Sequence, residues 1–241
     1  MRRIAIAALI VMSVFVTTAP VWASAQTEIT TATNQGKAVF IVVTQADARG
    51  TDRAIGIANQ AIALAPNAAV VVLDRTAPEN RPLVDRFRVL GAPVPLILVL
   101  ASNGVLAGGA LLKDATPQNL VATIPTPKKA EMLMHLHLKH PVFVVVSKKT
   151  MIEARGSVFE ACTKAMQLLE KKAGTVVVDS DDKAEKAWLK ELNIGAKETT
   201  PVTIVFNAKG QKTQVFRSVM TGEQLVQAVK KKLPCCPGGD C

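Results

Sequence analysis

The sequence contains few aromatic residues. Phe, Trp and Tyr together make up 4% of its 241 residues, and tyrosine is absent. The formal net charge is +10, and a basic protein can bind nucleic acid, anionic lipid or an acidic partner. Surfaces that hold nucleic acid stack the bases on aromatic side chains set among Arg and Lys, and the sequence has no such cluster. We therefore exclude nucleic acid as a partner, and we expect the lysines of the second half to lie on solvated helix faces.

Motifs of common enzyme classes are also missing. The sequence has no glycine-rich phosphate loop, no zinc-protease motif and no nucleophile elbow. Its three histidines lie within residues 135–140, and three of its four cysteines lie within residues 235–241. Metal or thiol chemistry therefore has few places to occur.

The first 25 residues have the features of an export signal. Arg2 and Arg3 precede an apolar run from Ile4 to Val16, and Ala23-Ser24-Ala25 supplies the small residues that a signal peptidase accepts. A membrane anchor is the alternative, but the run is short and no other hydrophobic span approaches ~20 residues. We expect residues 1–25 to be a signal peptide, cleaved after Ala25 to leave a charge of +8. The product would be periplasmic or secreted, with no membrane span.

The rest of the chain repeats itself at an offset of about 105 residues, which indicates a duplicated domain. Five matches occur in the same order: residues 39–43 with 142–146, 48–51 with 154–157, 70–74 with 175–179, 95–104 with 201–210, and 116–121 with 221–226. Each copy has about 100 residues, which is enough for a hydrophobic core of its own.

Each copy predicts the order strand, helix, strand, helix, strand, strand, helix. Continuous Val, Ile and Leu runs are typical of strands buried on both faces. The first helix of copy one is predicted to begin near Thr51 and to end before Pro66. Its counterpart is predicted to begin at Ser157, because Ser157 and Glu160 have the spacing of a capping box. The predicted fold class is α/β, with two tandem α/β sandwich domains.

Each half resembles a thioredoxin-fold domain. The similarity rests on the proline that opens the first strand of the hairpin, in Val94-Pro95-Leu96 and Thr200-Pro201-Val202. It also rests on the hairpin turns around Asn103 and Lys209 and on the closing helix of each copy. The resemblance implies that Pro95 and Pro201 are cis and face the start of the first helix. The resemblance covers roughly residues 36–126 and 140–233, and we assign residues 26–126 to domain 1 and residues 141–233 to domain 2.

The sequence departs from that family at the redox position. A thioredoxin catalyst needs Cys-x-x-Cys at the start of the first helix, where the helix dipole lowers the pKa of the attacking thiol. The aligned segments here are Ala48-Arg49-Gly50-Thr51 and Ala154-Arg155-Gly156-Ser157, and neither contains a thiol. We expect both domains to be redox-inactive, and they resemble the non-catalytic domains of protein disulfide isomerases, which bind rather than react.

Two arginines in these segments are candidate anion ligands. Arg49 and Arg155 are expected just before helix N-termini, where backbone N–H groups favour anions. The alternative is that the neighbouring Gly-Thr and Gly-Ser pairs cap the helices while both arginines point to solvent.

Cysteine use is uneven. Cys162 lies in phase with Val158, Ala165 and Leu169, so we expect a buried, inert thiol. Residues 234–241 form a predicted flexible tail with Cys235, Cys236 and Cys241. Three interpretations remain for the tail: thiolate ligands for copper(I) or zinc, a redox-active or partner-linking disulfide, or an inert extension.

The histidines occur in residues 127–140, which we expect to form a helix or linker between the domains. His137 and His140 would share a helix face at i, i+3, with Met134 one turn earlier, and these ligand types suit copper. The alternative is an amphipathic helix whose Met and Leu side chains pack on a sheet while the histidines face water.

These observations favour an exported binding or scaffold protein rather than an enzyme. Its partner would be another exported protein or a metal ion. The alternative is a thiol-disulfide oxidoreductase or reductant relay with Cys235, Cys236 and Cys241 as its catalytic thiols.

Overall fold

The computed structural model describes residues 24–195 and 198–231. The N-terminal half of the described chain forms domain 1, which begins with helix α1 and ends with helix α4. Its elements are α1 (Ala25–Asn34), β1 (Ala38–Thr44), α2 (Thr51–Leu64), β2 (Ala68–Asp74), the 3-10 helix η1 (Pro78–Asn80), α3 (Arg81–Phe87), β3 (Leu96–Leu100), β4 (Leu106–Leu111) and α4 (Pro117–Thr123).

Domain 2 repeats this order. Its elements are α5 (Pro127–His137), β5 (Val142–Ser147), α6 (Ile152–Leu168), β6 (Gly174–Asp179), η2 (Lys183–Glu185), α7 (Lys186–Glu191), β7 (Val202–Phe206), β8 (Lys212–Phe216) and α8 (Gly222–Lys230). None of the described helices is long and apolar enough to cross a membrane.

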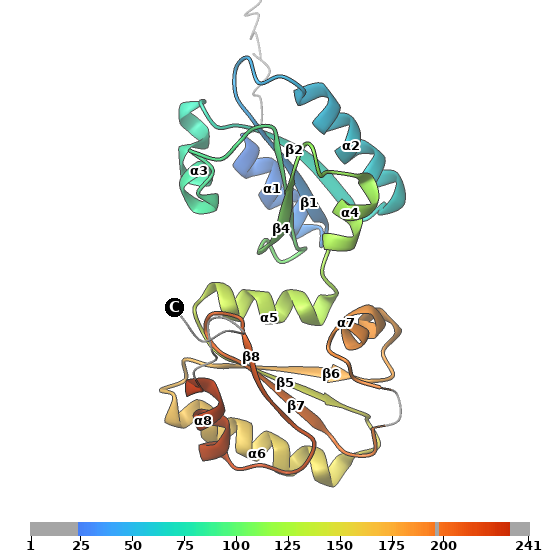
Figure 1. Cartoon of the computed structure of the whole chain (residues 1–241), viewed down its shortest axis with the longest axis vertical. Coiled ribbons are helices and arrows are strands. Elements are labelled where there is room, and N and C mark those ends of the chain that lie inside the picture. Colours follow the sequence, from blue (N-terminus) through green and yellow to red (C-terminus); the bar gives the residue numbers. More distant parts are fainter. Residues whose placement is uncertain (1–23, 196–197, 232–241) are drawn as a thin grey trace, which may run out of the picture.

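The two sheets have the same topology, which confirms the predicted duplication. The strand order is β2-β1-β3-β4 in domain 1 and β6-β5-β7-β8 in domain 2. In each sheet the two central strands are antiparallel, the first pair along the chain is parallel, and the last pair forms an antiparallel hairpin. Figure 1 shows the domains one above the other, with α5 between the two sheets.

Each sheet is covered by helices on both faces. In domain 1 every residue of β1 is buried, and successive side chains alternate between the two faces. One face packs against α1 and α3, and the other packs against α2 and α4. In domain 2 the corresponding helices are α5 and α7 on one face, and α6 and α8 on the other. Each domain is therefore a three-layer α/β/α sandwich with two hydrophobic clusters.

The first helix of each domain extends the predicted order. Helix α1 packs on β1 and β2, and α5 packs in the same way on β5 and β6. The segment expected between the domains thus contributes a helix to the covering layer of domain 2, with Met132 in its core. The α1 helix was not predicted. Four of its ten residues are Thr, and only Ala25, Ile29 and Ala32 are buried.

Two hydrogen bonds, one to a glutamate and one from an asparagine, anchor α5. Glu185 is 1% exposed, and its Oε1 accepts the Lys128 backbone N–H at the start of α5 over 2.9 Å. From domain 1, Asn103 in the β3–β4 turn donates to the Ala130 carbonyl over 2.8 Å. Helix α5 therefore belongs to domain 2 and also contacts domain 1.

Two local predictions are wrong. Helix α6 begins at Ile152 rather than Ser157. Its first one and a half turns hold exposed and half-buried residues, so the apolar pattern marks the helix only from the core stripe that starts at Val158. The capping-box pattern at Ser157 and Glu160 occurs inside the helix. The cis prediction holds for Pro95 but not for Pro201, since Val94–Pro95 is the only cis bond among the described residues. An X–Pro bond favours trans by a small margin, so the resemblance alone could not determine the isomer.

Candidate functional site

The start of α2 in domain 1 is closed by hydroxyl groups where a redox thiol would act. The Thr51 hydroxyl lies 2.7 Å from the Thr44 hydroxyl and donates to the Ala48 carbonyl over 2.9 Å. Gly50 precedes the helix with φ +89, and a Cβ atom there would lie 2.6 Å from the Leu112 side chain. Thr51 therefore holds the loop against the end of β1, and glycine is required before it.

Arg75 ties this loop to the segment before Pro95. Its Nε donates to the Gln45 side-chain oxygen over 2.9 Å. Its Nη1 donates to the carbonyls of Val89 and Ala92, over 3.1 and 2.6 Å. These three partners come from two separate loops, so the guanidinium holds the two loops together at this end of the sheet. The sequence analysis missed Arg75 because its partners are 14 to 30 residues away along the chain.

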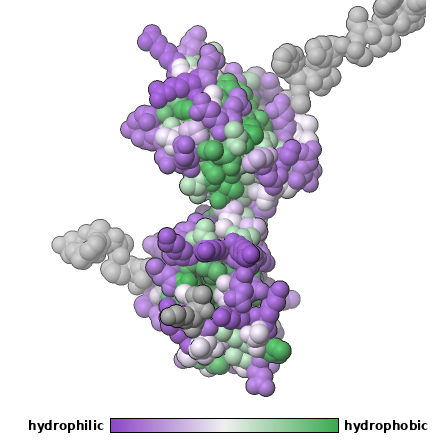
Figure 2. Space-filling view, turned by 90° about the vertical axis from the view of Figure 1, so that its right-hand side faces the viewer, coloured by the Kyte–Doolittle hydropathy of each residue, from purple (hydrophilic) through white to green (hydrophobic). Residues whose placement is uncertain are grey.

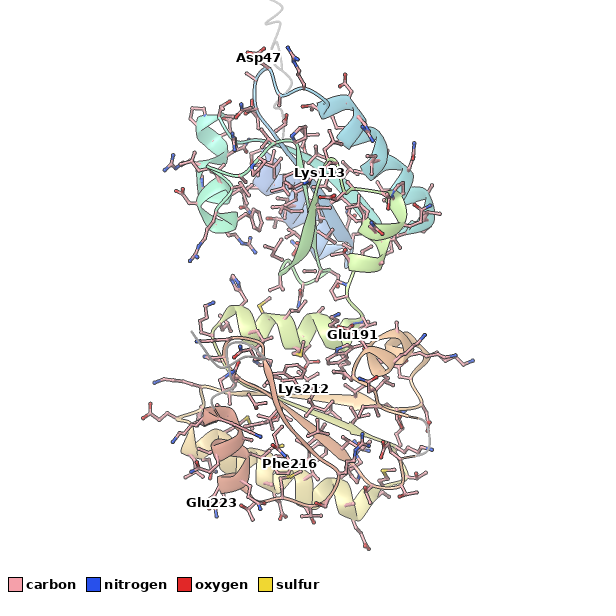
Figure 3. The ribbon with its side chains drawn as sticks, in the orientation of Figure 1. Asp47, Lys113, Glu191, Lys212, Phe216 and Glu223 are labelled. Carbon is pink, nitrogen blue, oxygen red and sulfur yellow. The ribbon has the colours of Figure 1, made fainter. Side chains whose placement is uncertain are left out.

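Arg49 belongs to the loop between β1 and α2. Its side chain is exposed, as the solvent-facing alternative expects, and the start of α2 follows two residues later. In Figure 3 the neighbouring Asp47 lies at the end of domain 1 that is remote from α5. The start of α2 therefore faces away from domain 2.

Domain 2 differs at the corresponding place. Helix α6 follows the four residues 148–151 and has no side-chain cap. Arg155 lies inside the helix, with its guanidinium 5.5 Å from the centre of the Phe159 ring. Its Nε is buried and has no hydrogen-bond partner among the described residues. The prediction that Arg155 precedes a helix N-terminus is wrong because α6 begins three residues before it.

A cavity lies beside the start of α6. It has a volume of about 680 Å³ and is lined by Lys148, Thr150, Met151, Ile152, Glu153, Ala154, Glu198 and Thr199. We call this cavity the α6 groove. Ile152 is 76% exposed, the largest value among the exposed large hydrophobic residues of the described chain. Glu198, one of the lining residues, forms an ion pair with Arg217. The groove thus combines an exposed aliphatic side chain with charges of both signs.

One thiol lies within the described residues, and it is buried. Cys162 is 1% exposed in the core between α6 and the sheet. Burial raises the pKa of the Cys162 thiol to about 11, with a smaller opposing effect from a hydrogen bond to Thr175. A thiolate is the reactive form, so Cys162 is inert at neutral pH, as predicted. Cys235, Cys236 and Cys241 lie outside the described residues.

The strand order of the two sheets identifies the fold of each domain. A parallel β1–β2 pair, an antiparallel β3–β4 hairpin, and helices on both faces recur in both halves. Each domain has a thioredoxin-like fold. Neither thioredoxin-like domain has a cysteine at the start of its α2 or α6 helix, so the expected absence of Cys-x-x-Cys applies to both.

Several solved structures of thioredoxin-like proteins are similar to this chain. Human ERp44 in its zinc-bound form matches with 11% identity and a TM-score of 0.35, over 86% of this chain and 55% of that one. The first two thioredoxin domains of Saccharomyces cerevisiae Eps1p match with 12% identity and a TM-score of 0.30, over 85% and 96%. Full-length ERdj5 matches with 17% identity and a TM-score of 0.30, over 86% and 28%.

This chain therefore spans about half the length of ERp44 and about a quarter of ERdj5. No protein-family model and no curated protein sequence matches the chain.

The histidine segment does not have the predicted geometry. Helix α5 ends at His137, and Lys139 has a φ of 61° that turns the chain. His140 therefore lies beyond the helix, and it does not continue the face that carries Met134 and His137. Burial lowers the pKa of His135; the Glu131 carboxylate opposes this shift, and the nearby His140 adds a smaller lowering.

The ring of His135 packs on β6 at Gly174, where a Cβ atom would lie 2.4 Å from the ring. His137 is exposed, and Met134 is half-buried. Within residues 24–195 and 198–231, no three His, Cys, Asp or Glu side chains are grouped closely enough to hold a metal ion.

Proposed function

We propose that this protein is an exported binding or scaffold protein made of two thioredoxin-like domains that do no thiol chemistry themselves. One observation supports this proposal above the others. The start of α2 holds Thr51, the start of α6 holds Ile152, and the only thiol in the described chain is the buried Cys162. A hydroxyl or an aliphatic group cannot form a disulfide, so the domains retain the scaffold and lack the reacting atoms.

The α6 groove is the best candidate for the binding surface. Exposed aliphatic side chains at the centre of a polar rim are typical of sites that bury a partner's apolar side chain. Here Ile152 and Met151 are apolar lining residues of the groove, and Lys148, Glu153 and Glu198 are its charged ones. Figure 2 shows an apolar patch on domain 1 and smaller apolar patches on domain 2, each bordered by hydrophilic surface. The groove suits an extended polypeptide with an apolar residue between polar ones.

The test of the groove is binding of a carboxymethylated, permanently unfolded polypeptide. We expect the change Ile152→Asp to reduce binding about tenfold, since a buried aliphatic contact is lost and a charge takes its place. Leu64→Asp is the matched control, because Leu64 is also exposed, at 55%, and lies at the end of α2 in domain 1. Equal losses in the two variants would refute the assignment to the α6 groove.

In this proposal the tail supplies the thiol function. Cys235, Cys236 and Cys241 occur within seven residues, and thiolates are preferred ligands of copper(I) and zinc. The tail follows the lysines at the end of α8, and nearby cations favour the thiolate form. The cluster would bind a soft metal or pair with a partner's thiol.

A thiol-disulfide oxidoreductase is the second candidate, favoured by the same three tail cysteines. Reduction of a partner's disulfide would oxidise two of them to a disulfide. The domains would then serve to hold the substrate near the tail.

Metal titration and a disulfide-reduction assay separate the two candidates. We compare the unchanged chain with Cys235→Ser/Cys236→Ser/Cys241→Ser and with the control Cys162→Ala. Uptake of Cu(I) or Zn(II) that depends on the tail, without turnover of a disulfide substrate, supports the binding protein. Turnover that depends on the tail supports the oxidoreductase, and turnover that survives the triple substitution would contradict both.

A further inference from the structure

The positive charge of this chain is concentrated in domain 2. Residues 24–126 contain 8 Lys and Arg against 7 Asp and Glu, whereas residues 127–231 contain 18 against 11. The two domains share one fold, so the fold does not account for this difference. The excess positive charge therefore belongs to the side chains that decorate domain 2.

Six exposed lysines gather at one end of domain 2. They lie where helices α5, α6 and α8 end, where β5 and β6 begin, and in the β7–β8 turn. We call this surface the lysine end; its lysines are Lys139, Lys171, Lys172, Lys209, Lys230 and Lys231. Five of the six, all but Lys171, line a cavity of about 710 Å³ whose apolar wall comes from Pro141, Leu169 and Val229. In Figure 1 this end of domain 2 is on the left, where α8 and the end of α5 lie.

Little negative charge opposes these lysines. Glu170 is the only acidic residue in the chain segments that form the lysine end, and its carboxylate is 2.8 Å from Lys172. Lys139, Lys209 and Lys230 take part in none of the ion pairs found among the described residues. At least three cations are therefore available to a ligand.

The backbone is strained at two of these six lysines. Lys139 and Lys171 have φ angles of 61° and 60°, in the left-handed region where helix ends usually have glycine. The turns are held by hydrogen bonds from His140 N to His135 O and from Lys171 N to Met166 O, over 3.0 and 2.7 Å. A lysine within the last helical turn would interact with the helix dipole as favourably as one at these left-handed positions. The strained positions instead place the two ammonium groups beyond the helix ends.

The chemistry of the surface indicates which anion it fits. All six cations are lysines, which act as mobile point charges, whereas arginine is the residue for bidentate contacts to a defined carboxylate or phosphate. No aromatic side chain belongs to the lysine end, so bases have nothing to stack on. Leu138 and Leu168, next to the lysines at the ends of α5 and α6, are 55% and 52% exposed. Exposed aliphatic residues among lysines are typical of a surface that lies in the headgroup region of a membrane.

We propose that the lysine end docks on an anionic phospholipid bilayer. The lysines lie against the lipid phosphates, and Leu138 and Leu168 enter the boundary between headgroups and acyl chains. This contact needs neither the α6 groove nor the tail thiols, so it stands apart from the function proposed above. It would hold domain 2 at a membrane surface without a spanning segment.

The test is co-sedimentation with vesicles at low ionic strength. We use the chain from Ser24 onward, which keeps every described residue and omits the apolar run from Ile4 to Val16. Vesicles of phosphatidylcholine with about one third phosphatidylglycerol should bind the chain, and pure phosphatidylcholine vesicles should not. Raising the salt concentration should release the protein.

Matched substitutions locate the contact. Lys139→Gln/Lys209→Gln/Lys230→Gln should weaken binding to the anionic vesicles about 100-fold, because each lysine near an anionic surface contributes about a factor of five. The control Lys183→Gln/Lys186→Gln/Lys190→Gln removes the same charge from η2 and α7 and should leave affinity nearly unchanged. Leu138→Gln/Leu168→Gln should weaken binding about tenfold.

Glycine substitutions separate a membrane role from helix stabilisation. Lys139→Gly/Lys171→Gly should raise the melting temperature of domain 2 by about 4 °C, since glycine tolerates the left-handed φ, and should still weaken vesicle binding. Four results would overturn the proposal: no binding to anionic vesicles, equal binding to neutral ones, equal losses in both lysine triples, or displacement from vesicles by a polyglutamate peptide at an equal concentration of negative charge. The last result would assign the surface to an acidic protein.

Discussion

Replacing Thr51 with alanine tests whether the start of α2 is held by its hydroxyl. Thr51→Ala removes the contacts to the Thr44 hydroxyl and to the Ala48 carbonyl, at 2.7 and 2.9 Å. Each hydrogen bond contributes about 1 kcal/mol, and the partners left behind are part-buried. We expect domain 1 to lose about 2 kcal/mol of unfolding free energy, which lowers the melting temperature of a domain of this size by about 8 °C.

Ser157→Ala is the matched control, because the sequence repeat aligns Ser157 with Thr51. The structure places Ser157 on the exposed surface of α6, without a side-chain hydrogen bond to any described residue. Alanine is the better helix former by about 0.5 kcal/mol, so domain 2 should be unchanged or slightly more stable. The two substitutions should therefore act in opposite directions although the sequence treats them alike.

The assay can separate the two domains within one chain. Trp188 is the only tryptophan from Ser24 onward, and it is buried in domain 2. Its fluorescence follows the unfolding of domain 2, while far-ultraviolet circular dichroism follows both domains. Thr51→Ala should shift the dichroism transition and leave the Trp188 transition in place. A loss below 0.5 kcal/mol for Thr51→Ala, or similar losses for both substitutions, would refute the reasoning.

Three further predictions follow from single groups. The pKa of Cys162 is about 11 in the folded chain against a usual 9.0, so the thiol loses its proton at a lower pH in the unfolded chain than in the folded one. The stability contributed by the protonated thiol is present below about pH 9 and should be lost as the pH rises through 11. Cys162→Val should flatten that part of a pH–stability curve. Arg75→Ala should cost domain 1 about 3 kcal/mol by removing the guanidinium's bonds to Gln45 and two carbonyls, and should speed proteolysis of the chain between α3 and β3. Glu185→Ala should cost domain 2 about 2 kcal/mol, seen in Trp188 fluorescence, because the Lys128 N–H loses its acceptor; an unchanged transition would contradict the capping role.

The core elements of the fold could be predicted because their signal is local. Residues 39–43 and 142–146 are apolar at every position, and a run of this kind suits only a strand covered on both faces. The position of α2 also follows from local chemistry, since Gly50 and Thr51 precede the apolar stripe and Pro66 follows it. The same signals recur in the same order in the second half, so the duplication could be predicted from this one sequence.

The misplaced elements had weak or misleading local signals. Residues 25–34 include four Thr among their ten residues, and their burial depends on a sheet that forms later in the chain. Ser157 and Glu160 have capping-box spacing but lie inside α6, which begins five residues earlier at Ile152 and is buried only from Val158 onward. The contacts of Arg75 and Glu185 join residues far apart in the sequence, so only the folded chain brings them together.

The double role of α5 determines where the chain can be divided for separate production of its halves. A fragment that begins at residue 141 would lack the helix that covers Val142, Val144 and Val176 on one side of the sheet. Its core would be open to water and prone to aggregation. A cut between Thr123 and Thr126 keeps the N-terminal cap of α5. Among the described residues it removes the hydrogen bond from Asn103 and the contact of α5 with β4, and each core stays covered, so each half should remain folded.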